Sequence, residues 1–92
     1  MTLKMWQPVW IPCKVLPGSR TVWKFITVED NGDEWTGVTQ DSFLQDPSPG
    51  GSTYIEGMVT GFQGDVVMAR PRAETPIGSN VFRGPASALK VR

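Results

Sequence analysis

The sequence predicts an all-β protein, a small barrel of five to six short strands with one or two single-turn helices. Eight Pro and ten Gly are spread along the 92 residues and interrupt every candidate helix, and no apolar i, i+3, i+4, i+7 pattern is long enough to form one. Several short segments instead alternate apolar and polar residues or concentrate β-branched and aromatic ones, as strands do. The length predicts a single domain over residues 1–92 with a modest core.

The first strand is predicted in PVWIPCKVL, residues 8–16. Val9, Ile11, Cys13 and Val15 alternate with the residues between them, which is the period of a half-buried strand. The two prolines of this segment lack N–H groups, which favours an edge strand or a bent one.

A hairpin is predicted to follow. The segments RTVWKFITV, residues 20–28, and EWTGVT, residues 34–39, are joined through an Asn-Gly pair, whose residues both tolerate positive φ. The register of the first of these strands stays open. Trp23 and Phe25 point inward, or the equally apolar opposite face does, or strong bending buries both faces in part.

One helical turn is predicted after this hairpin, in QDSFLQ, residues 40–45. Asp41 is the expected cap, and Phe43 or Leu44 is expected to enter the core. The Pro- and Gly-rich segment 45–52 then forms a loop.

A second hairpin is predicted from TYIEGMVTGF, residues 53–62, and DVVMARPR, residues 65–72. Gly57 and Gly61 would allow sharp coiling or a close approach of two backbones. The residues expected to face inward are Ile55, Val59, Val67 and Ala69.

The closing segment is predicted to contain a loop, a short strand, a turn and a last strand. The loop covers residues 71–79, and the short strand lies around Val81 and Phe82. GPASAL then forms a helical or 3₁₀ turn that places Leu89 under the barrel, and residues 90–91 form the last strand.

Together these elements resemble the SH3-like small barrel: short strands, a long loop after the first, a tight central hairpin, and the turn PASAL just before a final strand. The resemblance implies that the first strand lies beside the last. The segment GSNVFRGPASALKV, residues 78–91, is also similar to the end of type II dihydrofolate reductases, small tetrameric barrels carried on mobile gene cassettes. In that family a Val-Gln-Ile-Tyr run lines a central pore and binds folate and cofactor. This chain has Asn80, Val81, Phe82 and Arg83 there, without the Gln and the Tyr, so the resemblance implies shape rather than activity.

The residue inventory excludes several chemistries. There is no His and a single Cys, so no intrachain disulfide can form and the usual zinc and copper ligand sets are missing. Cys13 alternates in phase with apolar residues, which favours a small buried hydrophobe over a nucleophile. No hydrolytic constellation is recognisable, and no cofactor is expected. The acidic residues around position 32 and the GFQGD segment are interpreted as turns.

The same inventory indicates a soluble protein of a reducing, cytoplasmic compartment. No run of 18 apolar residues and no cleavable leader pattern is present. No membrane contact is therefore expected.

Charge is distributed unevenly although the formal net charge is zero. No Lys or Arg occurs between Lys24 and Arg70, a segment that holds eight acidic residues. All nine basic residues lie in the flanks, so one face of the folded chain is expected to be cationic and another acidic.

The favoured functional interpretation is a non-enzymatic binding or assembly module. Four Trp exceed what a small barrel readily buries, so one or two are expected at an interface, although large aromatics can also cover barrel ends as structural lids. The expected ligand site is an aromatic groove with flanking arginines, formed by Trp10, Trp35, Tyr54, Phe62, Arg70, Arg72 and Arg83. A proline-rich or extended peptide would suit such a groove.

Three further expectations concern partners. Acidic and basic faces that complement each other between chains predict a homo-oligomer. A cationic side that joins Lys14, Lys90 and Arg92 to the other arginines would bind nucleic acid instead. The reductase resemblance adds a third alternative, an enzyme whose small-molecule pocket forms only at an oligomer axis.

Overall fold

The computed structural model describes residues 3–28, 32, 34–73 and 81–92. They form seven β-strands and two short 3₁₀ turns, which confirms the all-β prediction. In chain order the elements are β1 (Pro8–Pro17), β2 (Val22–Val28), β3 (Glu34–Gln40), η1 (Asp41–Phe43), β4 (Ser52–Gln63), β5 (Val66–Pro71), β6 (Phe82–Pro85), η2 (Ala86–Ala88) and β7 (Lys90–Val91).

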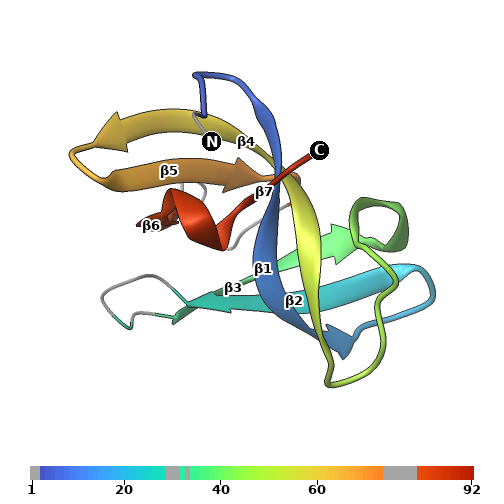
Figure 1. Cartoon of the computed structure of the whole chain (residues 1–92). Helices are drawn as coiled ribbons and strands as arrows, with labels where there is room; N and C mark the ends of the chain where they lie inside the picture. The colour runs from blue at the N-terminus through green and yellow to red at the C-terminus, as the bar shows by residue number, and fades with distance from the viewer. Residues whose placement is uncertain (1–2, 29–31, 33, 74–80) are drawn as a thin grey trace.

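The strands form one antiparallel sheet in the order β3-β2-β1-β4-β5-β6, and β7 pairs with β1 off this path. One edge of β1 pairs with β4 over residues 8–14, while the other edge pairs with β7 at residues 9–10 and with β2 at residues 14–17. The sheet therefore curls into a half-barrel, with the β4–β5 hairpin on one side and the β2–β3 hairpin on the other (Figure 1).

The strand β4 bends where its partner changes from β1 to β5. A Cβ atom at Gly57 would lie 2.4 Å from Cδ1 of Ile11 and 2.8 Å from the carbonyl oxygen of Arg70, so no larger residue fits there. The β4–β5 register then shifts between Val59 and Gly61, and such a bulge increases the local twist. The predicted close approach at Gly57 is confirmed.

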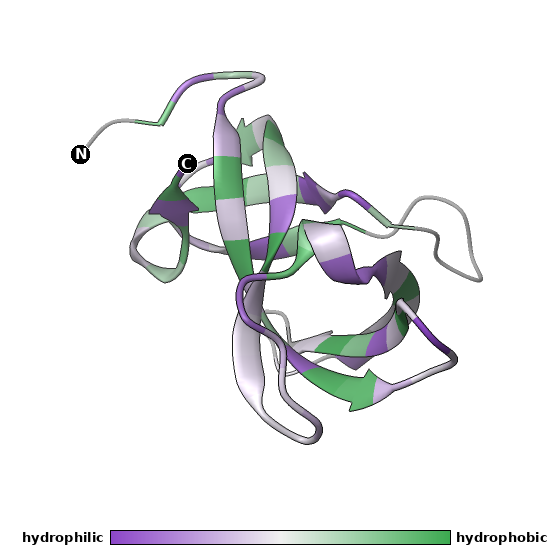
Figure 2. Ribbon diagram, turned by 90° about the vertical axis from the view of Figure 1, so that its right-hand side faces the viewer, coloured by the Kyte–Doolittle hydropathy of each residue, from purple (hydrophilic) through white to green (hydrophobic). Residues whose placement is uncertain are grey.

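The core lies on the concave side of the sheet and contains the residues that the alternation predicted. Val9, Ile11 and Val15 of β1 are fully buried, and Cys13 is nearly so. The inward residues of the second hairpin are also buried: Ile55, Val59, Val67 and Ala69. Hydrophobic and more polar residues alternate along the strands (Figure 2), and this alternation leaves the opposite face of β1 and β4 available for function.

The face of β2 that contains Phe25 points into the core, which settles the question that the sequence left open. Phe25 is fully buried and Trp23 packs partly against the core. Thr27, on the same face, is buried and donates a hydrogen bond of 3.0 Å to the carbonyl oxygen of Pro12. The indole of Trp23 donates to the carboxylate of Asp41 at 3.0 Å.

The turn η1 confirms one expectation and corrects another. Leu44 is buried and pairs with Ile55 as an isolated bridge, whereas Phe43 is only half-buried. Asp41 does not cap the turn, because the residue at the cap position is Gln40 and no side chain bonds there. Pro71, expected in the loop over 71–79, is instead the last residue of β5. Residues 74–79 of that loop and most of the predicted Asn-Gly turn lie outside the described residues.

The turn η2 follows β6 directly and precedes β7, as PASAL predicted. Leu89 is buried beneath it. The last strand therefore returns to β1, and the two ends of the described chain lie on the same side of the molecule (Figure 1).

Candidate functional site

Two of the predicted aromatic residues lie on neighbouring strands, but cations already cover their rings. Trp10 of β1 and Tyr54 of β4 both lie on the outer face and are half-buried. The guanidinium of Arg92 lies 5.2 Å from the centre of the Trp10 ring, and the ammonium of Lys90 lies 4.2 Å from that of Tyr54. Such cation–π contacts shield the rings from a ligand.

The other two predicted aromatic residues lie elsewhere. Phe62 is exposed near the tip of the β4–β5 hairpin, opposite Val67. Trp35 pairs with Thr27 within the β2–β3 hairpin, and its side chain is outside what the structure describes. Phe62 therefore lies far along β4 from Tyr54 and Trp10, and these three aromatics do not line one groove.

The predicted arginines are placed on or beside β5 and β6. Arg70 of β5 pairs with Met58, and Arg83 of β6 pairs with Met68. Arg72 follows the end of β5. Of these residues, Arg70 and Arg72 contribute to the same groove, which is described below.

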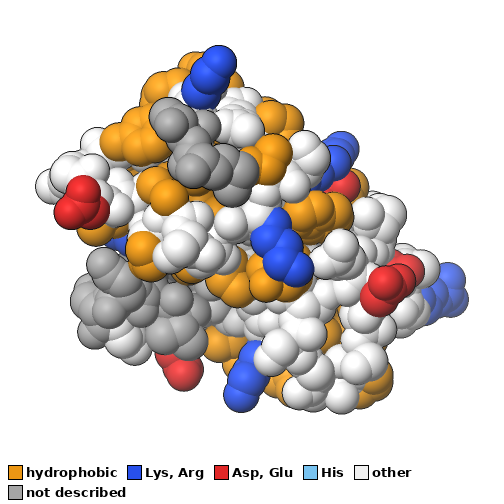
Figure 3. All heavy atoms as spheres, viewed as in Figure 1, with side chains coloured by type: hydrophobic (Ala, Val, Ile, Leu, Met, Phe, Trp, Pro, Cys, Tyr) orange, Lys and Arg blue, Asp and Glu red, His pale blue; other side chains and the backbone are white. Residues whose placement is uncertain are grey.

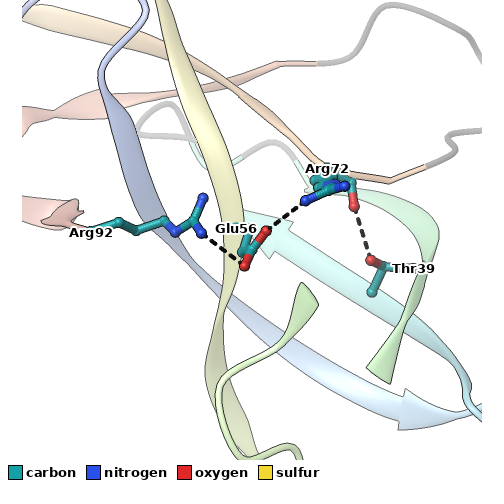
Figure 4. Close-up of polar contacts among 4 residues, drawn as sticks. All are labelled: Thr39, Glu56, Arg72 and Arg92. Carbon is teal, nitrogen blue, oxygen red and sulfur yellow. Dashed lines mark hydrogen bonds and ion pairs between the residues drawn. The ribbon is translucent and has the colours of Figure 1, made fainter. Parts of the chain in front are cut away.

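Glu56 links Arg92, the residue after β7, to Arg72, the residue after β5. Its carboxylate lies 2.9 Å from Nη2 of Arg92 and 3.3 Å from Nη1 of Arg72 (Figure 4). The Glu56 side chain is only 13% exposed, so this acid is largely committed to contacts within the chain. Sequence reasoning missed Glu56, because only the pairing of β1 with β4 and β7 brings it beside Arg92.

Arg72 is held on several sides. Its guanidinium lies 4.1 Å from the centre of the Phe43 ring. Its backbone N–H donates to the carbonyl of Glu56 at 2.8 Å. Its own carbonyl accepts from Oγ1 of Thr39 at 3.0 Å (Figure 4). Its charge is therefore fixed at this position although the side chain remains 63% exposed.

A groove of about 340 Å³ opens beside this network, and we call it the Trp6 groove. Trp6 and Met58 give it an apolar part, and three arginines with one carboxylate give it a charged part: Arg70, Arg72, Arg92 and Glu56. Trp6 is 63% exposed and Met58 is 41% exposed. Hydrophobic and basic side chains also lie next to each other on the face shown in Figure 3.

The groove has a net charge of +2, because three guanidinium groups and one carboxylate line it. Glu56 pairs with Arg72 and Arg92. Among the residues that the structure describes, the guanidinium of Arg70 makes no ion pair or hydrogen bond. Arg70 is therefore the group that is free to bind an anion.

Trp6 is held in an unfavourable backbone conformation by the turn that precedes β1. The N–H of Gln7 donates to the carbonyl of Lys4 at 3.2 Å, and the N–H of Trp6 donates to the carbonyl of Val59 at 2.8 Å. The φ angle of Trp6 is 64°, which is an outlier for a bulky side chain and costs roughly 1–2 kcal/mol. Sequence reasoning left Trp6 outside the site because nothing in the local sequence marks a left-handed residue there.

The predicted cationic side differs from the one that forms. In the register of β1 and β7, Lys90 pairs with Trp10, and Lys14 pairs instead with Ile26 and Ser52. Lys14 lies four residues farther along β1, roughly 13 Å away at the rise of a strand. The strands are adjacent as the barrel resemblance implied, but Lys14 does not join the cationic group.

The chemistry of the remaining polar groups is limited. Burial raises the pKa of the Cys13 thiol to about 12, because desolvation disfavours the thiolate. The thiol is therefore protonated at neutral pH and is a poor nucleophile and metal ligand. Within the described ranges, no group of three or more Cys, Asp or Glu residues is arranged to hold a metal ion.

No helix of the described residues is long and apolar enough to cross a membrane. Comparison with models of protein families, with curated proteins and with solved structures finds no match for this chain.

Proposed function

We propose that this chain is a non-enzymatic binding module that holds an extended acidic segment of a protein on the Trp6 groove. The observation that carries the proposal is the combination of an exposed, strained Trp6 with an Arg70 that lacks an acidic partner among the described residues. An apolar side chain of the ligand would lie on Trp6 and Met58, and a neighbouring carboxylate would pair with Arg70.

The topology supports an SH3-like barrel as the scaffold. The strand β1 pairs with both β4 and β7, the strands β4, β5 and β6 follow one another as an antiparallel meander, and η2 lies directly before the last strand. The similarity to the type II reductases remains one of shape, since Phe82 is buried in the core and Arg83 stands where that family has Tyr.

The strain at Trp6 favours a binding role over a structural one. A residue in the left-handed region persists when the surroundings enforce it, and such outliers gather at ligand sites. Burial does not explain the choice of Trp, because most of its side chain is exposed. A large flat ring at this place provides contact area for a ligand at small loss of side-chain entropy.

Electrostatics favour a carboxylate ligand over nucleic acid. The chain has no net charge and a pI near 6.1, below the basic character of a dedicated nucleic-acid binder. Glu56 also offsets one of the three positive charges in the groove. A single carboxylate beside Arg70 needs less positive charge than a phosphate backbone does.

The test is a fluorescence anisotropy titration with a labelled peptide Ser-Asp-Leu-Asp-Ser and a twin in which Asn replaces both Asp. We expect the acidic peptide to bind about tenfold more tightly than its twin. The variant Arg70→Gln should remove this difference. Lys24→Gln is the matched control, because it removes one positive charge from an exposed position on β2 outside the groove.

Two results would overturn the proposal. Equal affinity of the wild-type chain for both peptides, or no binding of either, would show that the groove does not recognise carboxylates. Tighter binding of a short single-stranded oligonucleotide, with affinity that falls steeply as salt rises, would favour nucleic acid instead.

A further inference from the structure

We infer that a second copy of this chain is one ligand of the Trp6 groove, and that it binds through the loop between η1 and β4, residues 45–50. This inference rests on the proposed function, because it names a partner for the same groove. Three features support it: the composition of the loop, its position relative to the groove, and the charges that remain unpaired.

The loop carries the two features that the groove would recognise. Asp46 supplies an exposed carboxylate, and Pro47 and Pro49 supply rigid apolar rings next to it. The carboxylate of Asp46 makes no ion pair or hydrogen bond with any part of the chain that the structure describes. It is therefore available to pair with Arg70, whose guanidinium also makes no ion pair or hydrogen bond within the described part of the chain.

The loop is also held in a defined shape. The N–H of Gly50 donates to the carbonyl of Val15 at 2.9 Å, and the N–H of Val15 donates to the carbonyl of Gly51 at 3.1 Å. Asp46 has a φ of 43°, a conformation that Asp adopts more readily than most residues do. A loop with fixed ends and two prolines loses little conformational entropy when it binds.

The loop does not line the groove of its own chain. Residue 52, just after the loop, pairs with residue 14 of β1, whereas Met58 in the groove pairs with Pro8. The N–H of Gln45, next to Asp46, donates to the carbonyl of Tyr54, four residue steps along β4 from Met58, roughly 13 Å at the rise of a strand. We therefore expect the contact to form between two chains.

The contact joins the loop of one chain to the groove of another, so it either closes as a reciprocal two-chain pair or repeats head to tail. Such head-to-tail contacts repeat and form either a closed ring or an open chain. The pairing of Asp46 with Arg70 is exposed to solvent, so we expect the association to weaken as salt rises.

The test measures mass by light scattering during size-exclusion chromatography, at concentrations from about 10 µM to about 1 mM. The wild-type mass should rise with concentration above that of one chain, 10.1 kDa. Asp46→Asn keeps the groove and a residue that tolerates positive φ, while Arg70→Glu keeps the loop. Neither variant should associate by itself.

An equimolar mixture of the two variants should form dimers and nothing larger. The intact loop of the Arg70→Glu chain then occupies the intact groove of the Asp46→Asn chain, and the remaining loop and groove are both defective. Circular dichroism of each variant checks that it is folded, and both substituted positions are exposed.

The outcomes separate this inference from the proposed function. If the acidic peptide binds but the wild-type chain stays monomeric at all concentrations, self-association is refuted and an acidic segment of another protein is the ligand. If Asp46→Asn associates as strongly as the wild type, another surface is used and the inference is overturned. If the peptide also fails to bind, the proposed function is refuted as well.

Discussion

Trp6 has a backbone conformation and a side-chain exposure that are both unusual for a tryptophan in a small barrel. Its backbone lies in the region where glycine is most at ease, and its side chain is 63% exposed. Neither backbone preference nor burial therefore accounts for a Trp here. The proposed binding role would account for it, since Trp6 lines the same groove as Arg70 and Arg72.

The variant Trp6→Gly separates stability from binding. Glycine relieves the strain of the positive φ, so we expect the free energy of unfolding to stay within about 1 kcal/mol of the wild-type value. Binding of the acidic peptide should fall at least several-fold. Urea denaturation and the anisotropy titration measure the two effects.

Phe62→Gly is the matched control, because Phe62 is an exposed aromatic residue of β4 outside the groove. It should lower the free energy of unfolding by roughly 1 kcal/mol, since glycine weakens a strand, and leave binding unchanged. A large loss of stability in Trp6→Gly would instead make Trp6 a structural residue.

Cys13 gives the chain a pH dependence in the alkaline range. Its pKa rises from 9.0 to about 12 on folding, because burial disfavours the thiolate. Between these values the unfolded chain has lost the thiol proton and the folded chain retains it. The contribution of Cys13 to stability is therefore complete below pH 9 and declines as pH rises towards 12.

The measurement compares urea unfolding of the wild type and Cys13→Val from about pH 8 to about pH 11. Valine suits a buried strand position and has no titrating group, while all other alkaline groups are unchanged. The stability difference should shift in favour of the variant above pH 9. A difference that does not change with pH would contradict the burial of the thiol.

Single residues of the core were predictable, whereas those of the site were only partly so. The alternation in β1 correctly identified Val9, Ile11 and Val15, because burial on one face of a strand imposes a period of two. Glu56 and Arg92 have no such pattern. They meet because β4 and β7 both lie against β1, and no local sequence signal records that contact.

Among the strands, the bend of β4 decides where the groove forms. The strand pairs with β1 in its first half and with β5 in its second, and the turn before β1 lies against its middle. Gly57 permits this bend because a side chain would meet Ile11 and the Arg70 carbonyl. The groove beside Met58 therefore depends on one glycine.

Replacement of this glycine should be costly. In Gly57→Ala the new Cβ would lie 2.4 Å from Cδ1 of Ile11 and 2.8 Å from the Arg70 oxygen, and the backbone atom cannot move without disturbing β5. We expect the free energy of unfolding to fall by roughly 2–4 kcal/mol, measured by urea denaturation.

Gly64→Ala provides the comparison for that prediction. Gly64 has a φ of 60°, and a Cβ atom added there would have no neighbouring atom within 4 Å. Only the backbone strain of the substitution remains, about 1 kcal/mol. Equal effects of the two substitutions would show that the contact at Gly57 is not tight.

At the scale of the whole molecule, β1 joins the β2–β3 hairpin to the β4–β5 hairpin. It pairs with β2, β4 and β7, and the buried residues of both halves form one hydrophobic cluster. Neither the β2–β3 hairpin nor the β4–β5 hairpin has a core of its own, and an isolated hairpin is marginal in water.

The chain should therefore unfold in one cooperative step. Urea transitions followed by far-ultraviolet circular dichroism and by tryptophan fluorescence should have the same midpoint. Tryptophan fluorescence reports on Trp6 and Trp10 at β1 and on Trp23 and Trp35 of the β2–β3 hairpin, whereas circular dichroism reports on all strands. Separate midpoints would mean that parts of the sheet unfold independently.

Local sequence patterns were sufficient to specify the fold class, the inward residues of β1, β4 and β5, and the turn before the last strand. These features depend on the period of apolar residues and on the conformational preferences of Gly and Pro, and both can be recognised from residues close together in the sequence. Only the folded arrangement places Lys90 and Arg92 over two predicted site aromatics, separates Lys14 from Lys90, and joins Trp6 to Arg70. Each of these depends on the register between strands far apart in the chain, and a shift of two residues would preserve every local pattern while it changed every such contact.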